Sequence, residues 1–527
     1  MKRWLRRVLL ASTAIVLALG AWIGHNVRDR HPGYALDLAV DAGPPAPLEA
    51  GFAARSITPT VPDRWVDHDG DARRGNDEPW EDGNANGRFD PVWLAGFHNG
   101  RPARDVHDEL WARAVVLGDG RHRVALVVLD AIGFYHDAVV DVRQRVPAAA
   151  GIDHVIVAST HTHQAPDLMG LWGPSPGRTG VDPDYLEHVV ATAAAAVTEA
   201  ASAAQPASLR VVRVTDGPEA LVEDSRKPHV LDPDLRVLQA RDATGQTLGT
   251  LVAWANHPET TWDENTRVSS DFPHFVREAI EAELGGTAIY VNGAIGGLMT
   301  TRPRFAIHDP DTGEALLEPT FRKARAQGEQ LARLALQGLR RPTQHDEPGD
   351  GEALGPVELH TGALAIRART LELPLENRIF VLAAAIGTLP RGFTRWATVR
   401  TEVSAFTLGP MSFISIPGEL YPEILNGGIE SPEGADHGVE PVELPPLRQR
   451  MPGRFRFALG LAGDALGYII PKSEWDDEAP WLYGSNRETY GEVVSVGPNT
   501  APTLHGALLE LLDELATEPK EPQPEAR

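Results

Sequence analysis

The chain has 527 residues, enough for one large domain or two smaller ones, and its 42% hydrophobic and 23% charged residues are typical of a globular protein. Lys and Arg number 49 against 73 Asp and Glu, so the formal net charge is -24. This charge excludes nucleic acid as an expected partner, because nucleic-acid binding depends on basic side chains that neutralise phosphates. The chain has no cysteine. Disulfides are therefore excluded, and a metal site must use His, carboxylates or Tyr.

Residues 1–25 are predicted to be an export signal. Lys2, Arg3, Arg6 and Arg7 precede an apolar run over 8–23, and small residues around 18–21 would allow cleavage. An uncleaved membrane anchor is an alternative, and a buried N-terminal helix is a third. We therefore expect an exported protein, periplasmic or extracellular, that touches the membrane only through this segment. Residues 26–50, which contain Pro and Gly, are expected to be a tether.

Short β-branched runs then alternate with helical patterns, which predicts an α/β fold: a large mixed sheet flanked by helices, with the site at the carboxyl ends of strands. The predicted strands are 124–129, 155–158, 209–214, 251–255, 288–291 and 413–416. The predicted helices are 182–203, 272–284, 321–339 and 501–515. An acidic stretch over 344–355 is expected to be a connecting loop within one catalytic domain over 51–516. The Pro- and Glu-rich residues 517–527 are expected to be a disordered tail.

The predicted strand over 154–159 is followed by Thr160-His161-Thr162-His163. In an extended chain, residues i and i+2 point to one face roughly 6–7 Å apart. Zinc needs its nitrogens at about 2.0–2.1 Å, so an extended segment would supply one ligand and leave the other histidine for acid–base chemistry. A hydrogen-bonded structural pair of histidines is the alternative.

Three further strand ends carry polar side chains. The run over 251–255 leads into Asn256-His257-Pro258-Glu259, the run over 413–416 into Pro417-Gly418-Glu419, and a glycine-interrupted segment over 461–468 ends in Tyr468. Taken alone, each of these residues is more typical of a structural role. Together they indicate a site, because open α/β sheets build their sites at the carboxyl ends of strands.

These residues resemble the neutral, non-lysosomal ceramidase family. Ser159-Thr160-His161-Thr162-His163 followed by Pro166 is similar to the family's Ser/Ala-Thr-His-Thr-His-Ser-Gly-Pro stretch. The resemblance continues in order with Gly51-Phe52-Ala53-Ala54-Arg55-Ser56-Ile57-Thr58-Pro59, Val106-His107-Asp108, Asp232-Pro233-Asp234-Leu235 and Pro417-Gly418-Glu419. It runs from about 51 to 515 and looks closest to a shorter bacterial branch without the C-terminal immunoglobulin-like domain.

The resemblance implies a zinc site and two catalytic residues. It makes His161, His257, Glu419 and Tyr468 the zinc ligands. His163 falls where the family has a histidine for proton transfer or carbonyl polarisation, and Arg226 resembles an active-site arginine of the family. Two imidazoles, a carboxylate and a phenolate suit zinc and leave room for water or substrate.

One stretch departs from the family. Where ceramidases have Gly-Asp-x-Ser-Pro, this chain has Asn292-Gly293-Ala294-Ile295-Gly296-Gly297-Leu298-Met299-Thr300, with Met299 at the serine position. Methionine cannot attack a carbonyl, so serine-type chemistry would need Thr300 or Thr301. We therefore expect direct attack by zinc-bound water, whose pKa the metal lowers to about 7. The expected substrate or oxyanion loop comprises Gly293, Gly296, Gly297 and Thr300, with backbone N–H groups as donors.

A calcium loop is predicted upstream. Asp82, Asn84, Asn86 and Asp90 stand at positions 1, 3, 5 and 9 of a loop with glycine at position 6. Position 12 is Trp93 rather than Glu, so this is no EF-hand; Asp67, Asp69 and Asp71 are available to complete a structural calcium shell. The alternative is a solvated acidic loop.

The sequence thus supports a zinc amidohydrolase of the neutral ceramidase type that cleaves the amide of a small amphiphilic N-acyl compound, an N-acyl sphingoid lipid being one candidate. Two alternatives stay open. One is a zinc hydrolase of another envelope ester or amide, and the other is a non-catalytic envelope binding protein that retains zinc.

Overall fold

The computed structural model describes residues 2–297, 299–343, 356–389 and 391–516. Three mixed sheets make up its centre. The β22–β27 sheet has, in spatial order, β1 (Asp37–Val40), β22 (Leu364–Pro374), β24 (Thr398–Leu408), β25 (Met411–Ser415) and β27 (Phe455–Leu459), with β23 (Phe393–Arg395) also paired to β24. The β3–β9 sheet has β10 (Gln205–Pro206), β3 (Glu49–Ser56), β7 (Trp111–Gly118), β8 (Arg123–Leu129) and β9 (His154–Ser159). The β11–β16 sheet has β16 (Thr287–Val291), β14 (Thr247–Ala253), β13 (Leu235–Arg241), β11 (Ser208–Val214) and β20 (Val357–Leu359).

Each sheet ends in one parallel pair: β8 with β9, β14 with β16, and β25 with β27. The inner faces of the three sheets meet in one apolar cluster, which includes Leu126, Ile156, Leu251, Phe413 and Phe457. Strands buried on both sides read as continuous apolar runs, which is why these segments were recognisable in the sequence.

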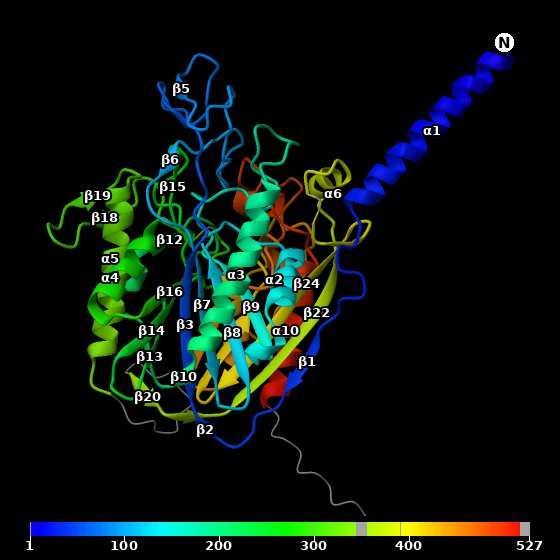
Figure 1. The fold of residues 1–527 in the computed structure, drawn as a ribbon. Helices are drawn as coiled ribbons and strands as arrows, with labels where there is room; N and C mark the ends of the chain where they lie inside the picture. Colours follow the sequence, from blue (N-terminus) through cyan, green and yellow to red (C-terminus); the bar gives the residue numbers. More distant parts are fainter. Residues whose placement is uncertain (1, 298, 344–355, 390, 517–527) are drawn as a thin grey trace, which may run out of the picture.

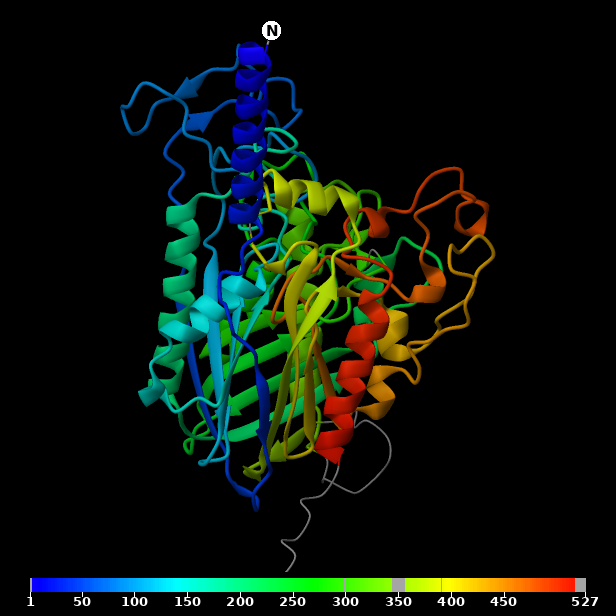
Figure 2. The same cartoon turned by 90° about the vertical axis from the view of Figure 1, so that its right-hand side faces the viewer.

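Helices cover the outer faces of the sheets (Figures 1 and 2). α2 (His136–Arg145) and α3 (Pro183–Ala203) pack on the β3–β9 sheet, α4 (Phe272–Leu284) and α5 (Phe321–Arg340) on the β11–β16 sheet, and α10 (Thr500–Ala516) on β22 and β24. The Asp182 side chain caps α3 by accepting from the N–H groups of Asp184 and Tyr185.

Short ladders and helices complete the described fold. The ladders are β2 (Ala46–Pro47) with β21 (Thr361–Gly362), β4 (Arg64–Trp65) with β5 (Trp80–Glu81), β6 (Asp105–Val106) with β15 (Arg267–Val268), β12 (Glu223–Asp224) with β17 (Met299–Thr300), β18 (Ile307–His308) with β19 (Ala315–Leu316), and β26 (Glu419–Leu420) with β28 (Tyr468–Ile469). The short helices are α6 (Arg378–Ala385), α7 (Pro422–Asn426), α8 (Leu447–Arg450) and α9 (Tyr490–Val493).

The predicted α/β class is confirmed, with the sheet divided into three parts. The four predicted helices form within one or two residues of the expected bounds, and each predicted strand overlaps an observed one. The predicted connector over 344–355 and the predicted tail over 517–527 lie outside the described residues.

α1 (Lys2–Asn26) projects away from the rest of the molecule (Figure 1). An 18-residue window within Arg3–Asn26 has a mean hydropathy of 1.9 and is not buried, so length and composition suit a membrane span or a signal sequence. The alternative of a buried N-terminal helix is therefore wrong.

The tether expected over 26–50 is also wrong. Val27 and Leu48 are buried, and β1 pairs with β22 at the edge of its sheet. The apolar residues in this segment find partners on strands more than 300 residues later, which Pro and Gly content alone does not reveal.

Candidate metal centre

His161 and His163 stand in a turn that follows β9. The strand ends at Ser159, and His161 has a φ of 68°, in the left-handed region. Its N–H donates to the carbonyl of Ala131 at 2.9 Å. The turn brings the two imidazole centroids to 4.9 Å. The separation of 6–7 Å expected for an extended chain is therefore wrong, and the two rings lie next to each other.

His257 arrives from the loop after β14. Its ring centroid lies 4.9 Å from that of His161 and 5.9 Å from that of His163. One ring nitrogen from each of these three histidines lies within 4.8 Å of the others, an arrangement that could hold a metal ion. Both the N–H and Nδ1 of His257 donate to the carbonyl of Met299, at 3.0 Å and 2.7 Å.

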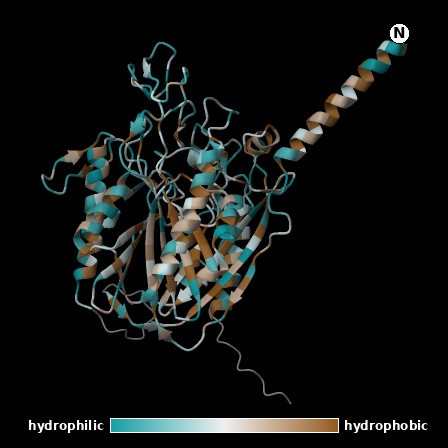
Figure 3. Ribbon diagram, in the orientation of Figure 1, coloured by the Kyte–Doolittle hydropathy of each residue, from teal (hydrophilic) through white to brown (hydrophobic). Residues whose placement is uncertain are grey.

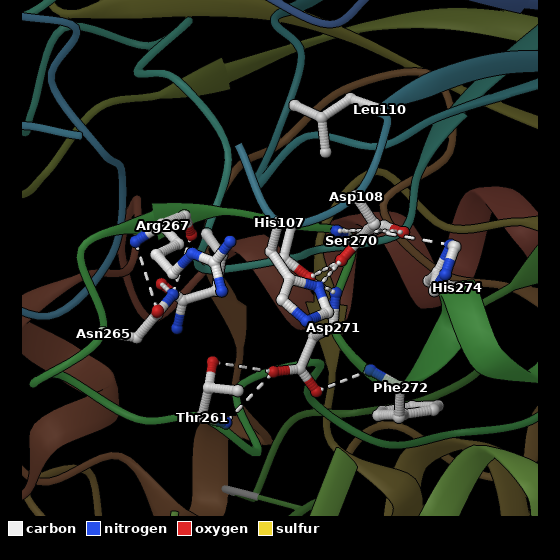
Figure 4. Close-up of polar contacts among 12 residues, drawn as sticks. His107, Asp108, Leu110, Thr261, Asn265, Arg267, Ser270, Asp271, Phe272 and His274 are labelled. Atoms are coloured by element: carbon white, nitrogen blue, oxygen red, sulfur yellow. Dashed lines mark hydrogen bonds and ion pairs between the residues drawn. The ribbon is translucent and has the colours of Figure 1, made fainter. Parts of the chain in front are cut away.

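A buried hydrogen-bond network fixes the loop that carries His257. The carboxylate of Asp271 accepts from the N–H and hydroxyl of Thr261, both at 3.1 Å, and from the N–H of Phe272 at 2.7 Å (Figure 4). Asp108 accepts from the Ser270 N–H at 2.9 Å and from the Ser269 hydroxyl at 2.5 Å, next to the same turn. The Val106-His107-Asp108 stretch noted in the sequence thus supports the segment that leads into α4.

Glu419 and Tyr468 are neighbours in a parallel ladder of β26 and β28. The Glu419 carboxylate lies 3.1 Å from Nε2 of His257 and 3.6 Å from Nε2 of His161. The Tyr468 hydroxyl lies 3.5 Å from Nε2 of His257. The structure therefore brings together all four residues that the resemblance implied as ligands.

The hydrogen bonds of two histidines define their tautomers. A carbonyl oxygen only accepts, so Nδ1 of His161, 2.5 Å from Ile132 O, and Nδ1 of His257 must each carry a hydrogen. In the neutral rings, each Nε2 then carries a lone pair, and both Nε2 atoms face the Glu419 carboxylate. The two lone pairs and the carboxylate repel each other unless a proton or a metal cation lies between the nitrogens and the carboxylate.

The pKa values follow from this crowding. Burial lowers the pKa of His161 to about 4, and burial together with His161 and His257 brings the pKa of His163 well below 6.5. Burial opposes charge on His257 as well, but Glu419 and Glu259 raise its pKa overall. Burial, with a contribution from Glu419, holds the pKa of Tyr468 well above 10.

These donors fit a zinc ion. Two imidazoles whose Nδ1–H groups bond to carbonyls, a carboxylate and a phenol oxygen form a nitrogen- and oxygen-rich set of the kind zinc takes. In addition, Nε2 of His163 is buried without a hydrogen-bond partner, so a third imidazole nitrogen is available at the same point.

Glu259 is a site residue that the sequence analysis did not single out. It is buried, its carboxylate lies 3.3 Å from Nδ1 of His163, and it accepts a hydrogen bond from the Thr300 hydroxyl. Gly96, with φ 82°, allows His163 this position, since a Cβ there would lie 2.6 Å from Nδ1 of the ring. The available signal for Glu259 in the sequence was its position, an acidic residue two places after His257.

The loop over 293–301 differs in part from its expected role. The N–H of Gly296 donates to the carbonyl of Leu420 at 2.8 Å, so it cannot serve as an oxyanion donor in this structure. A Cβ at Gly296 would lie 2.6 Å from the carbonyl oxygen of Glu419, which explains the glycine by close packing. Gly293 and Gly297 lie on the same loop, and their oxyanion role stays a prediction.

Neither threonine replaces the missing serine. The Thr300 hydroxyl donates to Glu259, and the Thr301 hydroxyl donates to Leu221 O at 3.1 Å. The Met299 side chain is fully buried in the apolar core beside α4 and α5, and only its carbonyl serves the site.

Arg226 lies in a separate ion network. It pairs with Glu423, lies 3.1 Å from Glu474 and stacks over the ring of Tyr421 at 4.0 Å. These contacts brace the turn after β26, and the catalytic role implied for Arg226 stays a prediction.

The predicted calcium loop is not supported. The Asp82 carboxylate accepts from the N–H groups of Asn86 and Gly87, and the Asp90 carboxylate accepts from the side-chain amide of Asn84 at 2.8 Å and from that of Asn86. The loop is thus closed by its own hydrogen bonds, in line with the alternative of a solvated acidic loop.

A largely apolar pocket leads to the histidines. His161, His163, Glu419 and Tyr468 line one part of it. Its apolar walls include Trp172, Leu375, Phe380, Leu389, Phe393 and Val496. The reactive groups therefore sit in a cavity suited to a ligand with an apolar chain.

Solved structures of ceramidases are among those to which the chain is similar. The neutral ceramidase from Pseudomonas aeruginosa shares 14% sequence identity at a TM-score of 0.60, covering 91% of this chain and 76% of that chain. A ceramidase complexed with C2 shares 15% identity at a TM-score of 0.61, covering 91% and 77%. The chain has the fold of the neutral ceramidases.

The resemblance predicted from scattered motifs is thus confirmed at the level of the fold. No protein-family model and no curated protein sequence matches the chain. At these identities the similarity establishes the positions of strands and loops, whereas the chemistry depends on this chain's own residues.

Proposed function

We propose that this protein is a zinc-dependent hydrolase that cleaves the amide bond of an N-acyl compound. The observation that carries the proposal is the convergence of His161, His257, Glu419 and Tyr468 at one end of an apolar pocket. The neutral ceramidase fold supports it, because structures of that fold come from enzymes named as ceramidases.

His161, His257, Glu419 and Tyr468 would hold the metal. Bound zinc supplies a Lewis acid that polarises a carbonyl and lowers the pKa of water to about 7. The carbonyls of Ile132 and Met299 orient the two imidazoles by accepting from Nδ1. Held in this way, each Nε2 faces the Glu419 carboxylate, where the ion would bind.

His163 is the proton-transfer candidate. Its side chain is 13% exposed, and the Glu259 carboxylate lies 3.3 Å from its Nδ1 without forming a hydrogen bond. A carboxylate at this distance would stabilise the ring electrostatically when Nε2 takes a proton, as expected for an acid–base histidine. Cleavage of an amide needs such a group, because the leaving amine must receive a proton.

The pocket favours an acyl chain over a peptide. Its walls carry Trp172, Phe380, Phe393 and aliphatic side chains, so the ligand would gain from burying apolar surface. An N-acyl lipid amide, including an N-acyl sphingoid base, therefore fits the proposed function better than a polar envelope conjugate.

Metal analysis of the purified protein, joined to hydrolysis of a panel of N-acyl amides and esters, tests the proposal. We expect one zinc per chain, turnover of fatty-acyl amides, and loss of both in His161→Ala and His257→Ala. An empty site in the active preparation would contradict the zinc enzyme. Zinc without turnover of any panel member would instead favour a binding protein.

A further inference from the structure

We propose that the outer face of α6, together with Trp396, is a docking surface for a lipid bilayer. Ile379, Leu382 and Ile386 are 64%, 62% and 41% exposed, and Trp396 is 53% exposed. The three aliphatic residues are spaced i, i+3 and i+7, so they share one face of the helix and its end. An N–H from Leu375 to the carbonyl of Ala397, at 3.0 Å, holds the Trp396 segment next to the start of α6.

The base of α1 identifies a bilayer as the occupant. The side-chain amide of Asn26, at the end of α1, donates to the carbonyl of Ala385, at the end of α6, at 3.0 Å, and both residues are buried. Val27 packs in the same apolar cluster as Ala384. α1 therefore leaves the folded part beside α6, and both are rich in hydrophobic residues (Figure 3).

The length of α1 agrees with this placement. Its 25 residues span about 37 Å at 1.5 Å per residue, more than the roughly 30 Å of a bilayer's hydrocarbon core. With α1 in the membrane, the contact between Asn26 and Ala385 holds α6 at the membrane surface. An apolar helix face in that position would lie about 5–10 Å deep, at the boundary between headgroups and acyl chains.

The charges around the surface also suit lipid headgroups. Arg28, Arg378 and Arg395 are exposed near it, Arg395 in an ion pair with Glu372 at 2.7 Å, although the whole chain carries a net charge of -24. Trp396 is of the residue type that concentrates at membrane interfaces. Contact with the membrane thus extends beyond the N-terminal segment to which the sequence analysis confined it.

α6 also lines the pocket. Phe380 lies between Ile379 and Leu382 in sequence but faces the cavity, together with Leu389 and Phe393. One helix therefore separates the proposed bilayer contact from the pocket. Given the proposed hydrolysis of N-acyl lipids, on which this step rests, an acyl chain would pass from the membrane into the pocket alongside α6.

The absence of native cysteine allows a direct test. Leu382→Cys and, as a control, Ser202→Cys on the exposed side of α3 are each labelled with an environment-sensitive fluorophore. The full chain is reconstituted into vesicles of phosphatidylcholine and phosphatidylglycerol, with or without lipids brominated along the acyl chain. We expect bromolipids to quench the label at 382 several-fold more than the label at 202. Equal quenching at the two positions would overturn the docking surface.

A second copy of the chain is the competing occupant. Protection of the label at 382 that grows with protein density and is insensitive to bromolipid would assign the face to self-association and overturn the bilayer. Equal thermal unfolding midpoints for the labelled chains and the unmodified chain exclude misfolding as the cause of any difference.

A double variant separates this inference from the proposed function. Ile379→Ser with Leu382→Ser should slow hydrolysis of an N-acyl lipid embedded in vesicles by about tenfold and leave a short-chain, water-soluble N-acyl amide unaffected. Equal loss on both substrates would overturn the delivery role of α6. If the unmodified chain hydrolyses neither substrate, the proposed function fails, while the quenching result still decides the docking surface.

Discussion

Glu259 connects the histidine cluster to the loop that replaces the family's serine. It faces His163 on one side and accepts from Thr300 on the other, and burial raises the pKa of its carboxyl. The Thr300 hydroxyl thus positions a carboxylate rather than attacking a substrate. Through Glu259, this loop therefore supports the proton-transfer candidate His163.

Glu259→Gln should therefore lower kcat on an N-acyl amide by about 10–100-fold, because proton transfer by a positioned histidine contributes at least about 100-fold and Glu259 supplies part of its support. The substitution keeps the volume and the bond from Thr300 but removes the charge beside His163. Zinc content should be unchanged, as Glu259 is not among the proposed ligands. Steady-state kinetics and metal analysis check this, with the exposed Glu264→Gln as the matched control. Wild-type kcat in Glu259→Gln would contradict a role for Glu259 in orienting His163.

The helices and strands that could be predicted from the sequence are those stabilised by contacts between residues close together in the chain. α3 was predictable because Asp182 and Pro183 mark its start, and the observed cap follows that pattern. β24 was not, because Thr401, Glu402 and Ser404 are polar residues buried in the middle of a strand. Their partners, including Arg143 and Ser415, come from other elements. The turn at His161 was missed for a similar reason, since nothing in its own sequence requires a positive φ.

Gly296 packs closely against β26, which carries the proposed ligand Glu419. A Cβ at this position would lie 2.4 Å from Cδ1 of Tyr421 and 2.6 Å from the carbonyl oxygen of Glu419. Gly296→Ala should therefore displace β26, weaken zinc binding and lower the unfolding free energy by roughly 1–3 kcal/mol. Competition with a zinc chelator and urea unfolding measure the two effects.

Gly506→Ala is the matched control for this substitution. Gly506 lies within α10 with no atom near its would-be Cβ, so alanine there should raise the unfolding free energy by about 0.5–1 kcal/mol. A stable Gly296→Ala protein with normal zinc affinity would show that β26 tolerates the shift, contrary to the expected close packing.

At the scale of the whole molecule, the proposed ligands join separate parts of the fold. His161 follows the β3–β9 sheet, His257 the β11–β16 sheet, and Glu419 and Tyr468 follow strands of the β22–β27 sheet. A shared ion would therefore tie three sheets together at one point. The residues span roughly three hundred positions, so only the resemblance to a family, and not local pattern, could group them in advance.

Removing the metal should therefore destabilise the whole chain. A ligand present at 100 times its Kd adds about 2.7 kcal/mol to the unfolding free energy. We expect zinc to raise Tm by several degrees over the chelator-treated protein, as followed by calorimetry. His257→Ala should abolish the shift, whereas the exposed His229→Ala should retain it. An unchanged Tm after removal of zinc would contradict a shared ion between the sheets.

Stability should also depend on pH through a buried group distant from the metal centre. His154 in β9 lies 3.5 Å from Glu402, beside Arg143. Burial, with a contribution from Arg143, lowers the pKa of His154 from 6.5 to about 4, although Glu402 opposes this. Between these values the unfolded chain takes up a proton that the folded chain refuses, so the unfolding free energy falls as the pH decreases.

The loss should begin near pH 6.5 and be complete near pH 4. It should amount to at most about 3.5 kcal/mol, because one pKa unit corresponds to about 1.4 kcal/mol. The pKa of Glu402 is also lowered: burial opposes its charge, but Arg143 outweighs that effect, so its contribution is lost in the same acidic direction. His154→Gln removes one titrating group and should flatten the dependence between pH 4 and 6.5. Urea unfolding across this range measures the slope, with the exposed His229→Gln as control. A slope equal to that of the wild type would mean that His154 accepts its proton in the folded state, contrary to its burial beside Arg143.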